Sequence, residues 1–420
     1  MKFRVEREVL GEAVSWVARA LPTRPVVPVL SGLLLEADGD ELILSCFDYE
    51  VSARVRIAAA VGEPGVALVP GRLLAEITKS LPAADVEVAS VAEMLMLTCG
   101  SAEFALVSLP LEDYPKLPEL PAAVGTVDGG ELARAAAQVA PSASRDDTLP
   151  MLTGVCMTFD GSELTLAATD RYRLAVRRLS WQPADLSLLA TALVPARTLA
   201  DVARTMGTGR PVTIAFGRPD PDAGRPADGL ISFEGDGRRL TARLIGAEFI
   251  KYASRFPQSF EASAELPAAV FAEAVRRVSL VADRTSPVQL AFRRDVVVIE
   301  AQSDGRARAV ESVPVGFAGT DRVISFNPHY LLDGLAAAML AGQGEAGAGG
   351  EDPATAGHIR LQFTSPAKPA LITWAEGVVQ ASDSESDHPG SAAVPRSPDG
   401  DVVHPAAFRY LVVPLRSPSG

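Results

Sequence analysis

The feature that most constrains the fold is an internal repeat. Residues 28–48 read PVLSGLLLEADGDELILSCFD, and residues 150–170 read PMLTGVCMTFDGSELTLAATD. The two segments align without a gap at an offset of 122 residues. Self-similarity over such a long period indicates that one supersecondary unit occurs more than once. The chain is therefore predicted to consist of copies of a single folding unit.

Each copy has a recognisable local pattern. Alternating apolar residues flank Asp38-Gly39 and Asp160-Gly161, and an Asp-Gly pair in that setting predicts a β-hairpin. Helical spacing precedes each hairpin, at Leu10, Ala13, Val14, Val17 and Leu21 in the first copy and at Leu132, Ala136 and Val139 in the second. ALVPGRLLAEI (67–77) and ALVPARTLADV (192–202) then predict a strand that leads through proline into a helix.

A weaker third copy occupies the C-terminal part. It has a helical pattern over 268–281 (Val270, Ala274, Val275, Val278), strands within 288–301, and a strand-then-helix step from Ile324 to Leu340. The expected fold class is therefore α+β, with three repeated domains over 1–122, 123–260 and 261–420. Two segments rich in Gly, Ser, Pro and Asp, 342–356 and 380–404, lack periodicity and are predicted to be flexible insertions.

Composition limits the classes of function. The net charge is −13 and the pI about 4.9, which argues against a protein that grips nucleic acid over its whole surface. Cys46, Cys99 and Cys156 lack metal-ligand spacing and are predicted to be free thiols in a reducing compartment. The charged N-terminus is unlike a signal peptide, and no apolar run could cross a bilayer. We therefore expect a cytoplasmic protein that does not contact membranes.

An enzyme is the rival class, and the sequence gives it little support. No two of the four histidines, His329, His358, His388 and His404, have metal-ligand spacing. The GxGxxG string at 342–347 follows a helical pattern within a Gly/Ala-rich stretch, which favours a linker over a nucleotide loop. Asp48, Asp170 and Asp304 recur at strand ends, where a turn role is simpler than a metal site. No catalytic residue, cofactor or metal is predicted.

A family resemblance enters at residues 168–176. ATDRYRLAV resembles the Thr-Asp-x-x-Arg-Leu-Ala pattern of the bacterial DNA polymerase III β subunit, the sliding clamp. MKFRVERE at the start, TRPVVPVLSG around Arg24, FNPHYLLDGL (326–335) and YLVVPLR (410–416) are similar to the same family. The resemblance covers nearly the whole chain. It implies a head-to-tail homodimer of three-domain subunits, with helices around a central hole and antiparallel sheets outside.

The resemblance also implies the partners. Such a ring encircles double-stranded DNA without reading its sequence. It tethers the polymerase III catalytic subunit, the clamp loader, other polymerases and repair factors through short peptide motifs. The alternative is a non-catalytic scaffold of the same fold that binds partner peptides without being loaded on DNA. Topological retention on circular DNA would separate the two.

Helix dimensions support a dimeric ring. If each domain supplies two helices about 8–10 Å apart, the six of one chain leave a hole far too narrow for a duplex. Twelve helices leave a hole of about 25 Å, enough for a duplex about 20 Å wide. Two chains can therefore encircle DNA, whereas one cannot.

Basic residues recur on the helices that would line the hole. Arg197 and Arg204 lie on one face of the helix predicted at 196–206, and Arg72 and Lys79 repeat that spacing at 71–81. The other candidates for the DNA channel are Arg19, Arg24, Arg134, Arg276, Arg277 and Arg284. Any one of them could be ordinary solvated helix surface. The recurrence at equivalent positions of two repeats favours the channel for the group.

The resemblance implies a peptide-binding cleft between the second and third domains. The matching residues are Leu152, Thr169, Arg171, Tyr172, Arg173, Leu174, Ile250, Ser254, Arg255, Ala367, Pro369, Leu411, Val413, Pro414, Leu415 and Arg416. For Leu152, Leu174 and Val413 alone, core packing is the simpler interpretation. Ile250 stands where the family has proline, Arg255 where it has an apolar residue, and Ser417 where it has leucine.

These departures lead to a hypothesis about specialisation. The chain would be an actinobacterial-type paralogue whose reshaped cleft evades an inhibitor, and so confers antibiotic resistance. For the subunit interface, the resemblance implies Phe104 and Leu106 on a strand and Leu280 on a helix. Interior packing is an equally open interpretation of these three residues.

Overall fold

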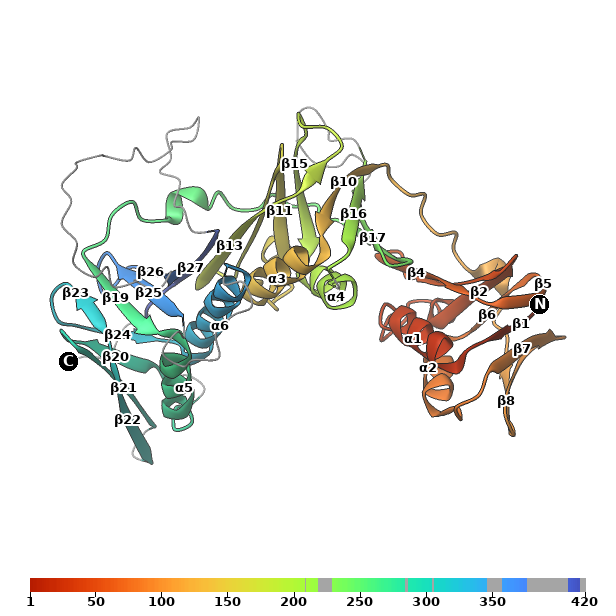
Figure 1. The fold of residues 1–420 in the computed structure, drawn as a ribbon, viewed down its shortest axis with the longest axis horizontal. Helices are drawn as coiled ribbons and strands as arrows, with labels where there is room; N and C mark the ends of the chain where they lie inside the picture. Colours follow the sequence, from red (N-terminus) through yellow and green to blue (C-terminus); the bar gives the residue numbers. More distant parts are fainter. Residues whose placement is uncertain are drawn as a thin grey trace, which may run out of the picture. The chain divides into compact units, whose positions relative to one another are not determined.

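The computed structural model describes residues 1–207, 209–217, 229–283, 286–303, 306–345, 357–375 and 407–415 (Figure 1). Contacts divide the chain into two compact units. The first unit comprises Met1–Ala133, Thr158–Ser162 and Ser180–Gly246, and the second comprises Arg134–Met157, Glu163–Leu179 and Ala247–Gly420. The three-domain boundaries at 122 and 260 stay a prediction.

Two antiparallel sheets form the first unit. The smaller contains β5 (Ala60–Glu63), β1 (Lys2–Val5), β7 (Val86–Val91), β8 (Met94–Cys99) and β9 (Ala102–Val107), in that order. The larger has nine strands: β14 (Gln182–Pro183), β10 (Ala123–Asp128), β16 (Pro211–Phe216), β17 (Leu230–Gly235), β18 (Arg238–Arg243), β4 (Val51–Ala58), β3 (Glu41–Phe47), β2 (Gly32–Asp38) and β6 (Gly65–Pro70). Strands β18 and β4 pair from Arg238↔Val55 to Ala242↔Val51, so segments far apart in sequence share this sheet.

Helices cover these sheets where the sequence predicts them. The first unit contains α1 (Arg7–Ala18), α2 (Gly71–Ser80) and α4 (Ala196–Met206), and α3 (Gly129–Val139) runs from the first unit into the second. Helices α1 and α2 pack against each other. Helix α4 buries Leu199, Val202 and Met206 along one stripe and exposes Arg197 and Arg204 on the other side. The predicted strands before α2 and α4 are β6 and β15 (Leu189–Pro195).

The predicted hairpins are confirmed. Strands β2 and β3 pair up to Asp38↔Glu41, and Gly39 has a φ of 57°. In the second copy, Gly161 has a φ of 52° between β11 (Gly154–Asp160) and β12 (Glu163–Thr169). Glycine adopts this left-handed conformation without a Cβ penalty. An Asp-Gly pair is therefore the right residue choice for both turns.

The recurring aspartates have the predicted turn role. Asp48 accepts hydrogen bonds from the backbone N–H groups of Glu50 and Val51, at 3.0 and 2.7 Å. Asp170 accepts equivalent bonds from Tyr172 and Arg173, at 3.0 and 3.1 Å. The residue after each aspartate has a positive φ, 73° at Tyr49 and 82° at Arg171. Asp304 lies outside the described residues.

The second unit also contains two antiparallel sheets. One orders β12, β13 (Arg173–Ser180), β27 (Phe408–Val412), β26 (Ala370–Ala375), β25 (His358–Phe363), β19 (Ala262–Pro267) and β23 (Gly316–Ala318). The other orders β22 (Ala307–Pro314), β21 (Val296–Ser303), β20 (Val288–Phe292) and β24 (Arg322–Phe326). Helices α5 (Ala268–Ser279) and α6 (Pro328–Glu345) pack against each other, and α6 also packs on β26 and β27. Short 3₁₀ turns occupy Pro28–Ser31, Leu111–Asp113, Ala140–Ser142, Pro150–Leu152 and Ala253–Arg255.

Two helix ends and one helix face differ from the sequence prediction. Helix α1 ends at Ala18, so Leu21 is buried beyond it. On α5, Val270 is half exposed and lies off the buried stripe. Helix α6 continues through Glu345, so residues 342–345 are helical although a flexible insertion was expected there. Helix propagation into a Gly-rich end costs only about 1 kcal/mol per glycine. The rest of that insertion and all of 380–404 lie outside the described residues.

Several further features bear on function. No helix in the described part of the chain is long and apolar enough to span a membrane. Within the described ranges, no group of three or more His, Cys, Asp or Glu side chains is placed to hold a metal ion. Cys46, Cys99 and Cys156 are buried thiols that form no disulfide with one another, and burial raises the pKa of the Cys46 thiol to about 12.

The repeat predicts matched stability effects. Leu42 and Leu164 are aligned copies, and both are fully buried. Replacing either with alanine should cost about 2–5 kcal/mol. Because the two residues belong to different units, hydrogen exchange should show loss of protection mainly in the first unit for Leu42→Ala and mainly in the second for Leu164→Ala. Leu189→Ala, at a residue that is 66% exposed, is the control and should leave both units unchanged.

Candidate functional site

A pocket of about 680 Å³ lies in the second unit. It is built where the start of β13, the end of β27 and the segment 248–255 meet. Its lining consists of Met151, Leu152, Thr169, Arg171, Arg173, Leu174, Glu248, Ile250, Ser254, Arg255, Pro369, Leu411 and Val413. Most of these residues were predicted for the peptide-binding cleft.

The apolar part of the pocket is also part of the core. Leu152, Leu174 and Leu411 are each no more than 5% exposed. Strand pairing places Leu174 opposite Leu411, so the two side chains are fixed by the sheet. Ile250, by contrast, is 39% exposed. Packing in the core and lining the pocket are therefore compatible roles for these leucines, because buried leucines present a fixed apolar surface to the cavity.

The turn from Thr169 to Arg173 shapes one side of the pocket. The Thr169 hydroxyl donates to the Arg173 carbonyl at 2.6 Å and accepts from the Arg171 N–H at 3.2 Å. Asp170 accepts from the next two N–H groups. All five residues from Thr169 to Arg173 thus have local hydrogen-bond partners, which keep the backbone in the strained conformation at Arg171.

Arg173 holds several elements together. Its Nε donates to Asp170 at 3.0 Å, and its other nitrogens donate to the Asp333 carboxylate on α6 and to the Pro141 carbonyl. Its guanidinium also lies 4.6 Å from the centre of the Tyr330 ring. Because these contacts occupy its donors, Arg173 serves to position the pocket wall.

Tyr410, on β27, contacts the α6 segment that Arg173 also contacts. Its hydroxyl donates to the Tyr330 carbonyl at 2.8 Å. Burial raises the pKa of Tyr410, so the phenol stays protonated and able to donate across the physiological range. Gly334 faces the Tyr410 ring, and an added Cβ would lie 2.5 Å from it. Helix α6 can approach the strand this closely only because residue 334 is glycine.

Arg171 and Arg255 are the exposed cations of the lining. Arg171 lies 5.8 Å from the centre of the Tyr172 ring. Arg255 ends a 3₁₀ turn, and the next residue, Phe256, is buried with the Arg409 guanidinium 4.2 Å from its ring centre. Burial raises the pKa of Tyr252 in this segment to about 12. The segment that carries Arg255 is thus anchored on both sides of it.

Some predicted cleft residues lie elsewhere. Tyr172 lines an adjoining pocket of about 660 Å³, where it stacks on Tyr330 at 6.0 Å. That pocket shares Arg171 and Arg173 with the first. Ala367, Pro414 and Leu415 do not line the larger pocket, and Arg416 lies outside the described residues.

The sequence prediction missed Met151 and Glu248. Met151 precedes Leu152 in the repeat, and this neighbouring position could have marked Met151 as a candidate for the pocket lining. Glu248 lies in a segment without periodicity, so no pattern marked it.

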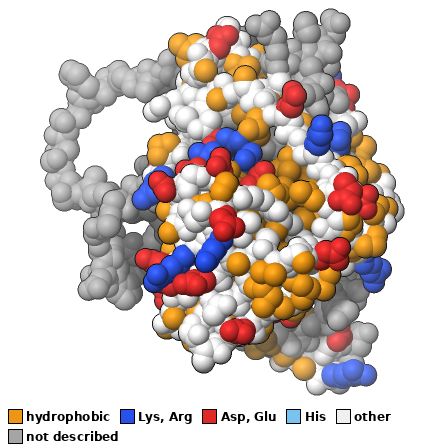
Figure 2. All heavy atoms as spheres, turned by 90° about the vertical axis from the view of Figure 1, so that its right-hand side faces the viewer, with side chains coloured by type: hydrophobic (Ala, Val, Ile, Leu, Met, Phe, Trp, Pro, Cys, Tyr) orange, Lys and Arg blue, Asp and Glu red, His pale blue; other side chains and the backbone are white. Residues whose placement is uncertain are grey.

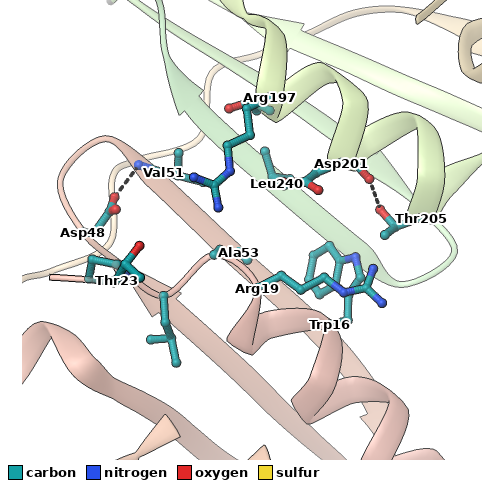
Figure 3. A pocket seen from close by; sticks show the side chains of 14 residues that line it. Trp16, Arg19, Thr23, Asp48, Val51, Ala53, Arg197, Asp201, Thr205 and Leu240 are labelled. Atoms are coloured by element: carbon teal, nitrogen blue, oxygen red, sulfur yellow. Dashed lines mark hydrogen bonds between the residues drawn. The ribbon is translucent and has the colours of Figure 1, made fainter. Parts of the chain in front are cut away.

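Five of the basic candidates for the DNA channel lie in the first unit: Arg19, Arg24, Arg72, Lys79 and Arg197. Arg19 and Arg197 both line a cavity of about 140 Å³ with Trp16, Asp48 and Asp201, as Figure 3 shows. Arg72 donates to the carbonyls of Leu21 and Pro22, at 3.2 and 3.3 Å. It therefore fixes the start of the loop that carries the exposed Arg24. Lys79 is also exposed.

Other channel candidates are paired with carboxylates. Arg204 pairs with Asp201 on its own helix. Arg276 pairs with Glu273, and Arg277 pairs with Glu311 at 2.6 Å. Such pairing reduces the positive charge that each arginine offers. Arg134 is half-buried, and Arg284 lies outside the described residues.

The predicted interface residues differ in exposure. Leu280 is 81% exposed and stands one residue beyond the end of α5, not within the helix. Phe104 is half-buried on β9, whereas Leu106 is 2% exposed and packs inside its own unit. Strands β9 and β22 are both edge strands of their sheets.

Comparison with known proteins identifies the family. The N-terminal, central and C-terminal domain models of the DNA polymerase III beta subunit match residues 1–118, 126–251 and 253–341. A beta sliding clamp of Streptomyces coelicolor is 44% identical over 416 residues and covers 99% of each chain. The beta sliding clamp homolog GriR of Streptomyces muensis is 44% identical over 335 residues, which is 80% of this chain and 88% of the relative.

Solved structures agree on the fold. The Pseudomonas aeruginosa DNA polymerase III subunit beta, in a crystal structure bound to griselimycin, superposes with a TM-score of 0.80 at 24% identity, covering 99% of each chain. The repeat, the strand-then-helix steps and all three domain models point the same way. The chain belongs to the DNA polymerase III beta subunit family, the sliding clamps of bacterial replication.

Proposed function

We propose that this chain closes as a head-to-tail homodimer around duplex DNA and tethers partner proteins through the pocket of the second unit. Family membership makes it a non-catalytic accessory subunit of DNA polymerase III. The observation that carries the proposal is the match of all three clamp domains along one chain. A closed ring holds DNA by topology, and so needs no tight contact with it.

The charge distribution suits a ring that slides. The chain is acidic overall, with a net charge of −13. Arg19, Arg24, Arg72, Lys79 and Arg197 supply local positive charge, whereas Arg204, Arg276 and Arg277 are partly neutralised. Affinity for DNA rises steeply with the number of phosphates neutralised. A few unpaired cations would guide the duplex without stopping its movement.

The pocket suits an extended peptide. It combines a fixed apolar surface with a few polar groups, the usual design of a site for a short motif. The adjoining pocket shares Arg171 and Arg173 with it, so one peptide could extend from one into the other. The polymerase, the clamp loader and repair factors would compete for this site.

Edge strands would join the two subunits. We infer that β9 of one copy meets β22 of the other, because both edges leave backbone groups free to pair. Val107 on β9, Val310 on β22 and Leu280 are each at least 50% exposed. Figure 2, which shows the side of the molecule where β7 and β8 lie, has apolar side chains gathered between charged ones. Two identical head-to-tail contacts would close the ring.

A second candidate function is resistance to a cleft inhibitor. We propose that this clamp is a specialised paralogue whose pocket tolerates partner peptides but excludes an inhibitor. Ile250 and Arg255, which depart from the family pattern, both line the pocket. A GriR homolog is among its relatives, and a clamp of the same fold has been crystallised with griselimycin.

Topological retention tests the ring. After loading by a clamp loader, the chain should co-elute with nicked circular plasmid in gel filtration and be lost once the plasmid is linearised. Leu280→Glu should abolish retention because a charge would be buried at the subunit contact. The matched control is Val323→Glu. Val323 is 54% exposed and lies on β24, at the opposite edge of the sheet from β22, so this variant should still be retained on circular DNA.

Two outcomes would contradict the ring. Equal retention on circular and linear plasmid would show ordinary DNA binding. Peptide binding without any loading would favour the scaffold alternative.

Inhibitor binding tests the specialised paralogue. Griselimycin should bind this chain at least about tenfold more weakly than the Streptomyces coelicolor clamp, a free-energy difference of about 1.4 kcal/mol. The double substitution Ile250→Pro with Arg255→Val should recover most of that difference, as measured by calorimetry. Equal affinities for the two unmodified clamps would rule the idea out.

A further inference from the structure

We propose that the cavity of about 140 Å³ in the first unit binds a ligand that carries both a guanidinium and a carboxylate. Free arginine is such a ligand, and so is an arginine at the carboxyl end of a peptide. The inference goes beyond the proposed function and does not depend on it, because neither the ring nor the tethering pocket requires this cavity.

The cavity lies at a joint where a strand of one repeat pairs with a strand of the next. Strand β4 pairs with β18 there, and the joint recurs in the second unit, where β13 pairs with β27. At the first joint the Arg243 N–H donates to the Glu50 carbonyl at 2.8 Å. At the second joint the Val413 N–H donates to the Tyr172 carbonyl, also at 2.8 Å. The two joints therefore share one backbone design.

An arginine side chain links the elements of the second joint. The Nε of Arg173 donates to Asp170, and its other nitrogens donate to Asp333 and to the Pro141 carbonyl. These partners come from the β12–β13 turn, from α6 and from the 3₁₀ turn after α3. The second joint thus shows how this backbone arrangement receives a guanidinium.

The first joint has the same set of partners without the arginine. The residues aligned with the partners of Arg173 all line the cavity: Asp48 with Asp170, Arg19 with Pro141, and Asp201 with Asp333. The first two pairs have the repeat offset of 122 residues, and the two aspartates of the third pair each lie two residues after a fully buried leucine of α4 or α6. The copy of Arg173 itself is Val51, which also lines the cavity. The cavity therefore lies where an arginine side chain has been replaced by a shorter one.

The carboxylates of the first joint have oxygens to offer. Asp48 accepts two backbone N–H groups through Oδ1, and its Oδ2 accepts no hydrogen bond from the residues that the structure describes. Asp170 divides its oxygens in the same way, with Arg173 on its Oδ2. Asp201 pairs with Arg204, whose side chain is 61% exposed, so water weakens that pair. A guanidinium between the two aspartates would therefore find acceptors on both sides.

Arg19 and Arg197 define the other half of the ligand. Both are exposed, and within the described ranges neither side chain forms an ion pair or a hydrogen bond. Figure 3 shows the Arg197 side chain pointing into the cavity from α4. These cations would repel a ligand that carried a guanidinium alone. A carboxylate on the same ligand would pair with them, because a guanidinium presents donors that match two carboxylate oxygens.

The apolar wall suits the aliphatic part of an arginine side chain. Trp16 and Leu240 line the cavity and are each 5% exposed. Methylene groups can pack on such a surface while the charged group at their end reaches a carboxylate. Lysine offers similar methylene groups but lacks the planar fork that can bond two aspartates at once. The cavity is therefore expected to prefer arginine to lysine.

Fluorine NMR of the full-length chain provides the test. The chain has three tryptophans, Trp16, Trp181 and Trp374, and of these Trp16 alone lines the cavity. After labelling with fluorinated tryptophan, substitution of each tryptophan by phenylalanine assigns the three signals. At constant ionic strength, L-arginine should shift the Trp16 signal with a dissociation constant in the millimolar range. The other two signals should not move.

Analogues of arginine test the two charged groups separately. Citrulline has a neutral urea in place of the guanidinium, and agmatine lacks the carboxylate. Each should bind at least about fivefold more weakly than arginine, because each loses a charge-assisted pair. An acetylated dipeptide that ends in arginine distinguishes the two sources of the ligand. Binding as tight as that of arginine assigns the site to a chain end, and weaker binding assigns it to the free amino acid.

Variants locate the ligand in the cavity. Val51→Arg places a guanidinium there from the protein itself, as Arg173 does at the second joint, so its Trp16 signal should no longer respond to arginine. Val66→Arg adds the same charge at a residue that is 46% exposed and does not line the cavity. This matched control should respond as the unmodified chain does. Asp201→Asn, which leaves the cavity unfilled, should weaken binding at least about fivefold.

Three results would overturn the inference. If arginine shifts all three tryptophan signals alike, or none of them, no ligand is bound specifically at this cavity. If citrulline binds as tightly as arginine, the guanidinium plays no part. If the Trp16 signal of Val51→Arg still responds fully to arginine, the ligand does not occupy the place of the missing side chain.

Discussion

The pocket depends above all on the partly buried side chain of Arg173. It joins the β12–β13 turn to α6 through Asp170 and Asp333, and it lies over Tyr330, whose carbonyl receives the Tyr410 hydroxyl. Removing Asp170 or Asp333 would leave the guanidinium with fewer compensating contacts, although water partly screens the pair with Asp333, whose side chain is 45% exposed. Thr169, Leu174 and Leu411 line the same cavity, and the pairing of β13 with β27 places Leu174 opposite Leu411. Arg173 therefore positions the residues that line the pocket.

The two units use the repeated turn for different purposes. In both copies an aspartate caps the turn and the next residue has a positive φ. In the first copy that residue is Tyr49, whose ring lies edge-on to Phe47 at 5.5 Å. In the second copy it is Arg171, which lines two adjoining pockets. The two copies thus share one turn, and only in the second copy does the residue after the aspartate line these two pockets.

The sequence predicts well those features that depend on neighbouring residues, and poorly those that depend on contacts between distant segments. The Asp-Gly pairs located both hairpins, and the helical spacing located α2 and α4 within one residue of their ends. Helix α6 extended beyond its predicted end, because the glycines there lower helix propensity without forbidding a helix. The Arg173–Asp333 contact, the exposure of Leu280 and the entry of Glu248 into the pocket arise from packing between distant segments. The periodicity of the sequence does not reveal such contacts. The family resemblance indicated most of the residues that line the pocket, but not Met151 or Glu248.

Two copies of the chain are proposed to close into a ring through β9 and β22. The most direct measurement joins Val107→Cys and Val310→Cys across the proposed contact with a bismaleimide, after loading on a nicked circular plasmid. The native thiols are buried and should not compete. We expect a covalent ring that stays on the circle in denaturing detergent and is released only when the plasmid is cut. A cross-linked dimer that leaves the intact circle in detergent as readily as it leaves linear DNA would contradict it.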